Sequence, residues 1–381
     1  VVSRILSAGD LGTFRGGNGF PVKYQGKKSG DLPFFKVSDM NSAGNELFMS
    51  RANNYISESR RKSLGAVRLP AGAIVFAKVG AAVFQERKRI LAQDSCIDNN
   101  MSAFIVDENL IDVRFAHYLL TAFKMSDLVS VGALPSLNGG QLRSIPLLVP
   151  VELSEQRRIV EALKSADDLI GTLERLIAKK QAIKQGMMQQ LLTGRTRLPG
   201  FNAAWRSRPL GELLSYEQPN RYLVSSADYT RAGTPVLTAG KTFVLGRTTE
   251  RRGIFEDVPV IIFDDFTTAS KYVDFPFKAK SSAMKMLSAR VGGNLRYIFE
   301  RMQLIDFAAV DHKRRWIAEF SKIEINVPNK DEQDAVAVVL EDFDAEIDLL
   351  KHRLVQARAI KTGMMQQLLT GRVRLPAEAS A

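Results

Sequence analysis

The chain has a single cysteine among its 381 residues, Cys96. One cysteine can form neither a disulfide within the chain nor a cysteine-based metal site, which fits a reducing, cytoplasmic setting. No run approaches the roughly 18 apolar residues that a membrane-spanning helix needs, and residues 1–10 lack the pattern of a signal peptide. The sequence therefore predicts a cytoplasmic protein with no membrane partner.

Catalytic and cofactor-binding motifs are missing as well. No Gly-x-Gly-x-x-Gly follows a predicted strand, and neither a phosphate-binding loop nor an Asn-Pro-Pro-Tyr methyltransferase motif is present. The histidines, His117, His312 and His352, stand apart from one another. Asp264 and Asp265 have no further acidic or histidine ligand at metal spacing, and a turn at a strand end is the better interpretation. We expect no enzyme activity, no metal and no cofactor in this chain.

What the chain does have is positive charge. Lys and Arg number 53 against 41 Asp and Glu, which gives a net charge of +12 and a pI of about 9.7. Such an excess favours an anionic partner, most commonly nucleic acid. The apolar content of 45% is that of a globular protein, and the length suggests two or three domains.

One segment of the chain occurs twice. Residues 183–199 (IKQGMMQQLLTGRTRLP) and 360–376 (IKTGMMQQLLTGRVRLP) differ at two positions, and they are offset by 363 − 186 = 177 residues. Upstream, Glu155-Gln156 and Glu332-Gln333 keep the same offset. A period this long is no solenoid unit. It indicates a duplicated half in which one part was kept while the rest diverged.

The residues before both repeats have the apolar period of a coiled coil, with alternating steps of four and three. Each helix would span about 39 residues, or about 58 Å, and end at Gly194 or Gly371. The first half of the second helix is acidic and the second half of the first is basic, so we expect an antiparallel pair; two independent amphipathic helices are the alternative. Ser154 and Asp331 suit the N-cap positions. The apolar positions are Ile159, Leu163, Ala166, Ile170, Leu173 and Ile177, then Val336, Leu340, Phe343, Ile347, Leu350 and Leu354.

The other two segments are predicted to be α+β domains. Short apolar runs such as 72–76, 102–106 and 259–263 indicate strands, and 113–123 and 294–302 indicate short helices. Both segments open near a Leu-Gly pair, at Leu11 and Leu210, and close on Val-Pro, so we interpret them as one fold used twice. The predicted division is 1–150, domain 1; 151–199, helix 1; 200–328, domain 2; 329–376, helix 2; and 377–381, a tail.

This order of variable domain, long helix, variable domain and near-identical helix resembles the specificity (S) subunit of type I restriction–modification enzymes. Residues 33–40 (PFFKVSDM) look like an early strand of its target recognition domain, and the GMMQQLLTG helices look like its conserved regions. Residues 235–241 (PVLTAGK), 262–268 (IFDDFTT) and 280–285 (KSSAMK) are similar to a second-domain type of that family. Nothing like Trp205-Arg206 precedes Leu11-Gly12, so we expect the first domain to lack some opening residues.

The resemblance implies a DNA-reading subunit without catalysis of its own. Each recognition domain would read one half of a bipartite, gapped site in double-stranded DNA, with the paired helices fixing the gap. Two methyltransferase (M) subunits carrying S-adenosylmethionine would methylate adenine, and restriction (R) subunits using ATP and Mg would join them. A specificity subunit for a methyltransferase–nuclease fusion and a non-specific nucleic-acid-binding scaffold are the alternatives.

Polar and basic residues on predicted loops are the candidate DNA contacts, because base edges and phosphates need donors, acceptors and positive charge. Asp39 could instead cap local amides, and residues 313–315 could be a plain surface charge run. Domain 1 supplies Arg15, Lys23, Tyr24, Lys27, Lys28, Lys36, Ser38, Asp39, Asn41, Ser136, Asn138, Gln141 and Arg143. Domain 2 supplies Thr238, Lys241, Thr242, Asp265, Thr267, Thr268, Lys271, Lys280, Ser281, Ser282, Lys285, Lys313, Arg314 and Arg315.

The repeated helix ends are the candidate partner surface. Their near-identity exceeds what core packing demands, although Met187 and Met188 could also complete a core. The predicted partner-binding residues are Gly186, Met187, Gln189, Gln190, Gly363, Met364, Gln366 and Gln367.

Overall fold

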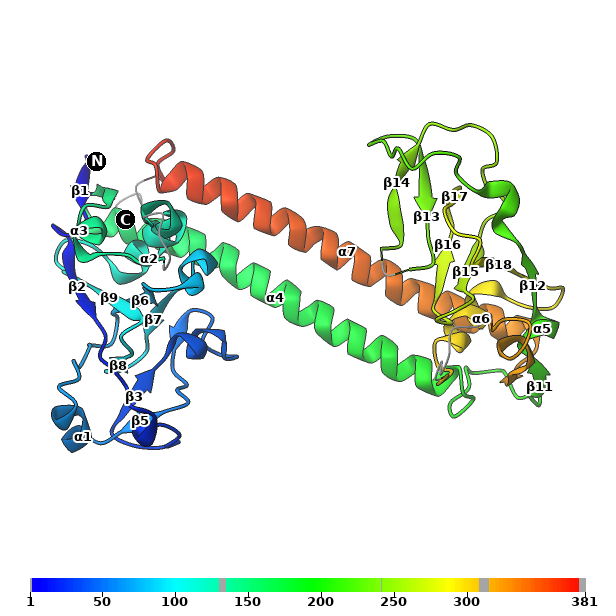
Figure 1. Ribbon diagram of the computed structural model, residues 1–381, viewed down its shortest axis with the longest axis horizontal. Helices are drawn as coiled ribbons and strands as arrows, with labels where there is room; N and C mark the ends of the chain where they lie inside the picture. Colours follow the sequence, from blue (N-terminus) through cyan, green and yellow to red (C-terminus); the bar gives the residue numbers. More distant parts are fainter. Residues whose placement is uncertain (1, 130–134, 241, 308–314, 377–381) are drawn as a thin grey trace. The chain divides into compact units, whose positions relative to one another are not determined.

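The computed structural model of the protein describes residues 2–129, 135–240, 242–307 and 315–376 (Figure 1). The chain forms two compact units: unit 1 comprises residues 1–172 and 353–381, and unit 2 comprises residues 173–352. Each unit therefore contains one predicted recognition domain and one half of each long helix. No helix in the described ranges is long and apolar enough to span a membrane.

Unit 1 is built from one strand pair and two small sheets. The pair is antiparallel, β1 (Ser3–Ser7) with β10 (Pro146–Pro150). The larger sheet has the order β2-β9-β6-β7-β4 and the smaller one β5-β3-β8. The strands are β2 (Gly12–Gly16), β3 (Leu32–Phe35), β4 (Phe48–Met49), β5 (Tyr55–Ile56), β6 (Ile74–Ala77), β7 (Lys88–Leu91), β8 (Cys96–Ile97) and β9 (Met101–Val106). The helices are η1 (Val22–Tyr24), η2 (Val37–Asn41), α1 (Glu58–Ser63), η3 (Ala81–Gln85), α2 (Val113–Ala122), η4 (Met125–Leu128) and α3 (Gly139–Arg143).

Unit 2 has the same plan. Its antiparallel pair is β11 (Arg206–Pro209) with β19 (Glu324–Val327), and its sheets have the orders β12-β18-β15-β16 and β14-β13-β17. The strands are β12 (Leu214–Glu217), β13 (Thr234–Leu237), β14 (Val244–Thr248), β15 (Val260–Asp264), β16 (Ser270–Val273), β17 (Lys278–Ala279) and β18 (Met284–Ala289). The helices are α5 (Leu210–Leu213), η5 (Pro219–Tyr222), α6 (Leu295–Met302) and η6 (Phe320–Lys322).

The two units match strand for strand apart from β4, which pairs parallel with β7 and has no counterpart among the described strands of unit 2. In the larger sheets, β2-β9-β6-β7 corresponds to β12-β18-β15-β16, and every neighbouring pair is antiparallel. In the smaller sheets, β3 and β13 each have one antiparallel and one parallel neighbour. The prediction of one α+β fold used twice is therefore confirmed, although the two domains share little sequence.

The long helices are α4 (Leu153–Leu191) and α7 (Lys330–Leu368), each of 39 residues. They run antiparallel, as the charge pattern predicted: Lys184 Nζ lies 2.6 Å from Asp344 in unit 2, and Lys361 Nζ lies 2.5 Å from Asp167 in unit 1. The two ion pairs occupy equivalent positions of the repeat, because their aspartates (344 − 167) and their lysines (361 − 184) are each 177 residues apart. The N-cap predictions for Ser154 and Asp331 are wrong, because α4 begins at Leu153 and α7 at Lys330. Asn329 precedes α7 instead, and its Oδ1 accepts from the Glu332 amide, 3.1 Å away.

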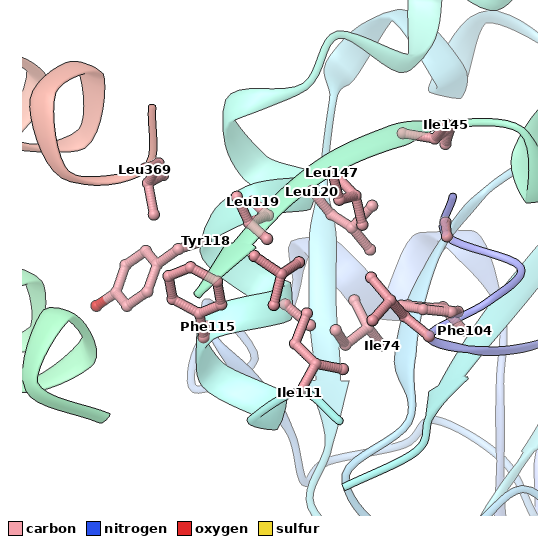
Figure 2. Close-up of a cluster of buried hydrophobic side chains, with 14 of the residues drawn as sticks. Ile74, Phe104, Ile111, Phe115, Tyr118, Leu119, Leu120, Ile145, Leu147 and Leu369 are labelled. Atoms are coloured by element: carbon pink, nitrogen blue, oxygen red, sulfur yellow. The ribbon is translucent and has the colours of Figure 1, made fainter. Parts of the chain in front are cut away.

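The predicted heptad positions lie on the buried side of α4 and α7. All twelve are buried or half-buried, whereas apolar residues off the stripe, such as Leu169, Leu349 and Val355, are more than half exposed. In unit 1, Ile159 and Leu163 of α4 and Leu369 after α7 also join the domain core, packing with residues of α2, β6 and β9. Figure 2 shows this core, with Phe115 and Leu119 of α2 among its central side chains. The domain is thus fastened to the helices by a shared apolar core.

A buried glutamine joins each recognition domain to its helix. Gln156 accepts from the amide of Asp112, the N-cap residue of α2, and donates to the carbonyls of Leu110 and Pro150. Gln333 repeats this arrangement, accepting from Asn294 at the N-cap of α6 and donating to Pro328. Since the glutamine secures three chain segments in each unit, the repeat of Glu-Gln has a structural reason.

Candidate nucleic-acid interface

The loops that follow three strands meet at one edge of unit 1. The amide of Asp98 donates to Phe35 O at 2.9 Å, and the amide of Lys78 donates to Asn100 O at 2.8 Å. Leu137 then donates to Lys78 O at 2.9 Å. These bonds bring together the ends of β3, β6 and β8 and the segment before α3. We call residues 15–18, 36–41, 78–80, 98–100 and 135–138 the unit 1 edge.

The same backbone bonds build an edge in unit 2. Lys280 donates to Leu237 O, Asp265 to Ala283 O and Arg315 to Asp265 O, at 2.9, 3.0 and 2.9 Å. We call residues 238–240, 264–268, 280–283 and 315 the unit 2 edge. Because each bond has its counterpart in unit 1, the equivalent positions can be named: Lys78 corresponds to Asp265, and Asp98 to Lys280.

Glycine allows the close approach at the unit 1 edge. A Cβ on Gly17 would lie 1.9 Å from the carbonyl oxygen of Asp98, which is an impossible contact. Without that atom, the Gly17 amide donates to Met101 O at 3.2 Å, and the Asn18 amide donates to Ile97 O at 3.0 Å. The segment around Gly17 is therefore held by backbone bonds, and the glycine allows the two backbones to approach.

Many predicted contact residues of unit 1 are accessible. Tyr24 in the loop between β2 and β3 carries the guanidinium of Arg60 over its ring at 4.0 Å, and Lys23 lies 5.0 Å from the ring centroid. Lys36 Nζ donates to Gln25 Oε1 at 3.0 Å. Tyr24, Lys36 and Gln141 are half-buried, while Arg15, Lys23, Lys27, Lys28, Ser38, Asn41, Ser136, Asn138 and Arg143 are exposed.

Asp39 is corrected from a DNA contact to a structural residue. It is fully buried, and its carboxylate accepts from the Lys36 amide at 2.7 Å and from the Asn53 side chain at 2.6 Å. The alternative of local capping is therefore right. Asn138 and Gln141 also use their side chains within the protein, since they form a reciprocal capping box at the start of α3.

Three predicted contacts of unit 2 are also corrected because they are buried. Lys285 and Asp265 are 1% and 2% exposed, and their charged atoms lie 3.3 Å apart. Asp265 Oδ1 additionally accepts from the amides of Arg315 and Trp316, at 3.1 and 2.9 Å. Arg315 is 2% exposed and pairs with Glu319 at 3.1 Å. These side chains hold the loops of the unit 2 edge in place. They could contact a ligand only if the edge opened.

The remaining predicted residues of unit 2 are accessible where they are described. Asp264 forms the expected strand-end turn, accepting from the Phe266 amide and from Thr267 Oγ1 at 3.0 and 2.8 Å. No group of three or more metal-ligating side chains occurs in the ranges that the structure covers. Lys241, Lys313 and Arg314 lie outside the described residues. Thr242, Thr267, Lys271, Lys280 and Ser282 are exposed, and Thr238, Thr268 and Ser281 are half-buried.

Three polar residues of the unit 1 edge were missed by the sequence analysis. Lys78 is half-buried, and Asn99 and Asn100 are exposed. They follow β6 and β8, as the predicted clusters at 264–268 and 280–283 follow β15 and β17. In the sequence, each of these residues comes soon after a short buried strand. That pattern identifies them only when the two domains are compared position by position. Burial raises the pKa of the adjacent Asp98, against the lowering effects of the Asn100 amide and Lys36.

The repeated helix ends expose equivalent surfaces in the two units. Gly186, Gln189 and Gln190 are exposed in unit 2, and Gln366 and Gln367 in unit 1, while Met187, Gly363 and Met364 are half-buried. Ile183 and Ile360, at the start of the repeat, are 40% and 62% exposed. Met187 packs against the core of unit 2 and Met364 against that of unit 1, so the methionines do complete a core.

Comparison with known proteins shows which proteins the chain is similar to. Residues 5–185 match the family described as the type I restriction modification DNA specificity domain. A specificity subunit of a type I restriction enzyme from Escherichia coli is 46% identical over 162 residues, which cover 39% of this chain and 40% of that protein. A putative type I specificity subunit from Methanocaldococcus jannaschii is 23% identical over 84% of this chain and 83% of its own length.

The fold agrees over nearly the whole chain. The crystal structure of a type I restriction–modification S subunit from M. genitalium superposes with a TM-score of 0.59 at 14% identity, covering 97% of this chain and 96% of that one. These matches are to specificity subunits of type I restriction–modification systems, as the resemblance indicated, and the family match covers residues 5–185. The matched proteins are described as specificity subunits, which agrees with the prediction of a recognition subunit.

Proposed function

We propose that the chain reads a bipartite, gapped DNA site, with each edge contacting one half-site. The observation that carries the proposal is that equivalent loops build both edges while different side chains occupy them. A cation is exposed on each edge, Arg15 in unit 1 and Lys280 in unit 2, together with small polar residues, and these suit phosphates and base edges in the major groove. Two different edges on helices with near-identical ends fit an asymmetric site.

The chain's role would be to direct adenine methylation, and restriction, by partner subunits. Two M subunits, carrying S-adenosylmethionine, would each dock on one of the repeated surfaces, because the same residues are accessible in both units. R subunits, with ATP and Mg, would join this assembly. The gap between the half-sites would depend on the length of α4 and α7, since rigid protein spacing sets half-site spacing.

Mapping of methylated adenines in genomic DNA, with and without this chain, tests the function. Loss of methylation at one gapped motif upon removal of the chain is the expected result, and it would give both half-sites. If no motif changes while the M subunit is expressed and active, sequence-specific targeting is wrong. Steep salt dependence without competitor discrimination would then support a non-specific scaffold, which the charge of +12 allows.

Native mass spectrometry of the chain with its M subunit tests the docking surfaces. We expect two M subunits per wild-type chain. Gln190→Arg and Gln367→Arg place a bulky charge on one surface each, so each variant should bind a single M subunit. Lys351→Met on the exposed side of α7 is the control and should keep both. Retention of two M subunits by both arginine variants would contradict the proposed surfaces.

A further inference from the structure

Lys78 occupies a central place at the unit 1 edge. It follows β6 directly, its amide bonds to Asn100 and its carbonyl accepts from Leu137, so its backbone joins three of the loops. Its side chain is half-buried. In the part of the chain that the structure describes, no hydrogen bond or ion pair from Nζ to a protein group is found. The ammonium lies over Gly16, where a Cβ would be 2.9 Å from Nζ.

The equivalent position in unit 2 has the opposite character. There Asp265 is neutralised internally by Lys285, and both side chains are buried. Lys285 is opposite Phe263 in the sheet, and the corresponding partner of Phe76 in unit 1 is Ser102. Ser102 is uncharged and donates to the carbonyl of Arg15 at 3.2 Å. The charge at this position is therefore compensated within unit 2 and uncompensated within unit 1.

A partly buried ammonium without a protein acceptor requires either water or a ligand oxygen. The neighbouring accessible groups are Arg15, Asn99 and Asn100, which are donors or amides. The carboxylates of the unit 1 edge, Asp39 and Asp98, are buried and bound to backbone amides. The accessible surroundings of Lys78 thus offer a cation and neutral amides, while the carboxylates are kept inside.

We propose that Lys78 donates a hydrogen bond to an acceptor oxygen of DNA and is a recognition residue of the unit 1 half-site alone. The inference rests on the proposed function. The acceptor is either a phosphate oxygen or guanine O6, since lysine binds both. Unit 2 has no equivalent cation at this position, so the two half-sites differ in this contact.

The test uses the complex of the full chain with its M subunits and a duplex that contains the mapped site. Lys78→Met removes the ammonium and keeps a long side chain, and Lys78→Arg restores a cation. Gly16→Ala displaces only the flexible end of Lys78 and is a second variant that leaves the lysine in place. Lys164→Met removes an exposed lysine of α4 in the same unit and is the matched control.

We expect Lys78→Met to weaken binding about 5- to 150-fold, the range of a good specific contact. Gly16→Ala should have a smaller effect in the same direction, and Lys78→Arg should recover part of the affinity. A salt dependence shallower by about one unit, with discrimination kept, identifies a phosphate. An unchanged salt dependence with lost discrimination at one base pair of the unit 1 half-site identifies guanine.

Three results would overturn the inference, and each has a different meaning. If the wild-type complex discriminates its site and Lys78→Met binds within twofold of it, Lys78 is not a contact while the proposed function stands. If the wild-type complex itself fails to discriminate the site, the proposed function fails and the inference fails with it. If Lys164→Met weakens DNA binding as much as Lys78→Met does, the effect of Lys78 reflects the overall positive charge and not a contact.

Discussion

Replacing Gln333 by leucine should destabilise unit 2 by removing the bonds that join α6 and β19 to α7. The glutamine is 1% exposed; it accepts from the Asn294 amide and donates to the Pro328 carbonyl, both at 2.9 Å. Leucine fills a similar volume but leaves a buried donor and a buried acceptor without partners. Each costs about 1–2 kcal/mol, so we expect a loss of about 2–4 kcal/mol in the free energy of unfolding.

Tryptophan fluorescence is the suitable assay, because both tryptophans, Trp205 and Trp316, belong to unit 2. With a denaturant dependence of about 2 kcal/mol per molar urea, the midpoint should fall by about 1–2 M. Gln189→Leu, at an exposed position of the same unit, should change the midpoint little. A Gln333→Leu midpoint within about 0.25 M of the wild type would refute the reasoning that buried amide bonds hold the domain to the helix.

Three further predictions follow from buried titratable groups. Burial lowers the pKa of His117 to about 4; since the unfolded state takes up the proton near pH 6.5, unit 1 should lose about 3 kcal/mol as the pH falls from 6.5 to 4, and His117→Gln should lessen this loss in circular dichroism melts. Lys285→Met leaves the Asp265 carboxylate buried without its cation and should cost about 3–5 kcal/mol by tryptophan fluorescence; wild-type stability would contradict the pairing. Burial raises the pKa of Cys96 to about 11, so thiol reagents at pH 8 should label the native chain far more slowly than the urea-unfolded chain, and equal rates would show that the thiol is open.

Much of the scaffold could be predicted from the sequence because its signals are local and periodic. The heptad spacing from Ile159 to Ile177 fixes which side of α4 is apolar, since a helix places residues three and four apart on one face. The acidic start of α7 and the basic end of α4 select the antiparallel order, since only that order places Asp344 beside Lys184. The exact repeat marks the duplication without any structure.

The candidate site was less accessible to prediction, because exposure depends on residues distant in sequence. Asp265 and Lys285 look like loop residues, but the β15–β18 pairing brings them together and the segment after residue 314 covers them. Lys78 looks unremarkable in its sequence context, and only the bonds from Leu137 and to Asn100 place it at the centre of an edge.

The sequence by itself determined the duplicated helices, their antiparallel pairing, the positive charge and the presence of two α+β domains. Only the tertiary structure decided which strands of those domains correspond, and which polar side chains remain accessible. The physical reason is that the strand ladders and loop junctions are held by backbone hydrogen bonds, which are compatible with many side chains. The fold can therefore repeat while the residues on its edges diverge, and two similar domains can present different surfaces.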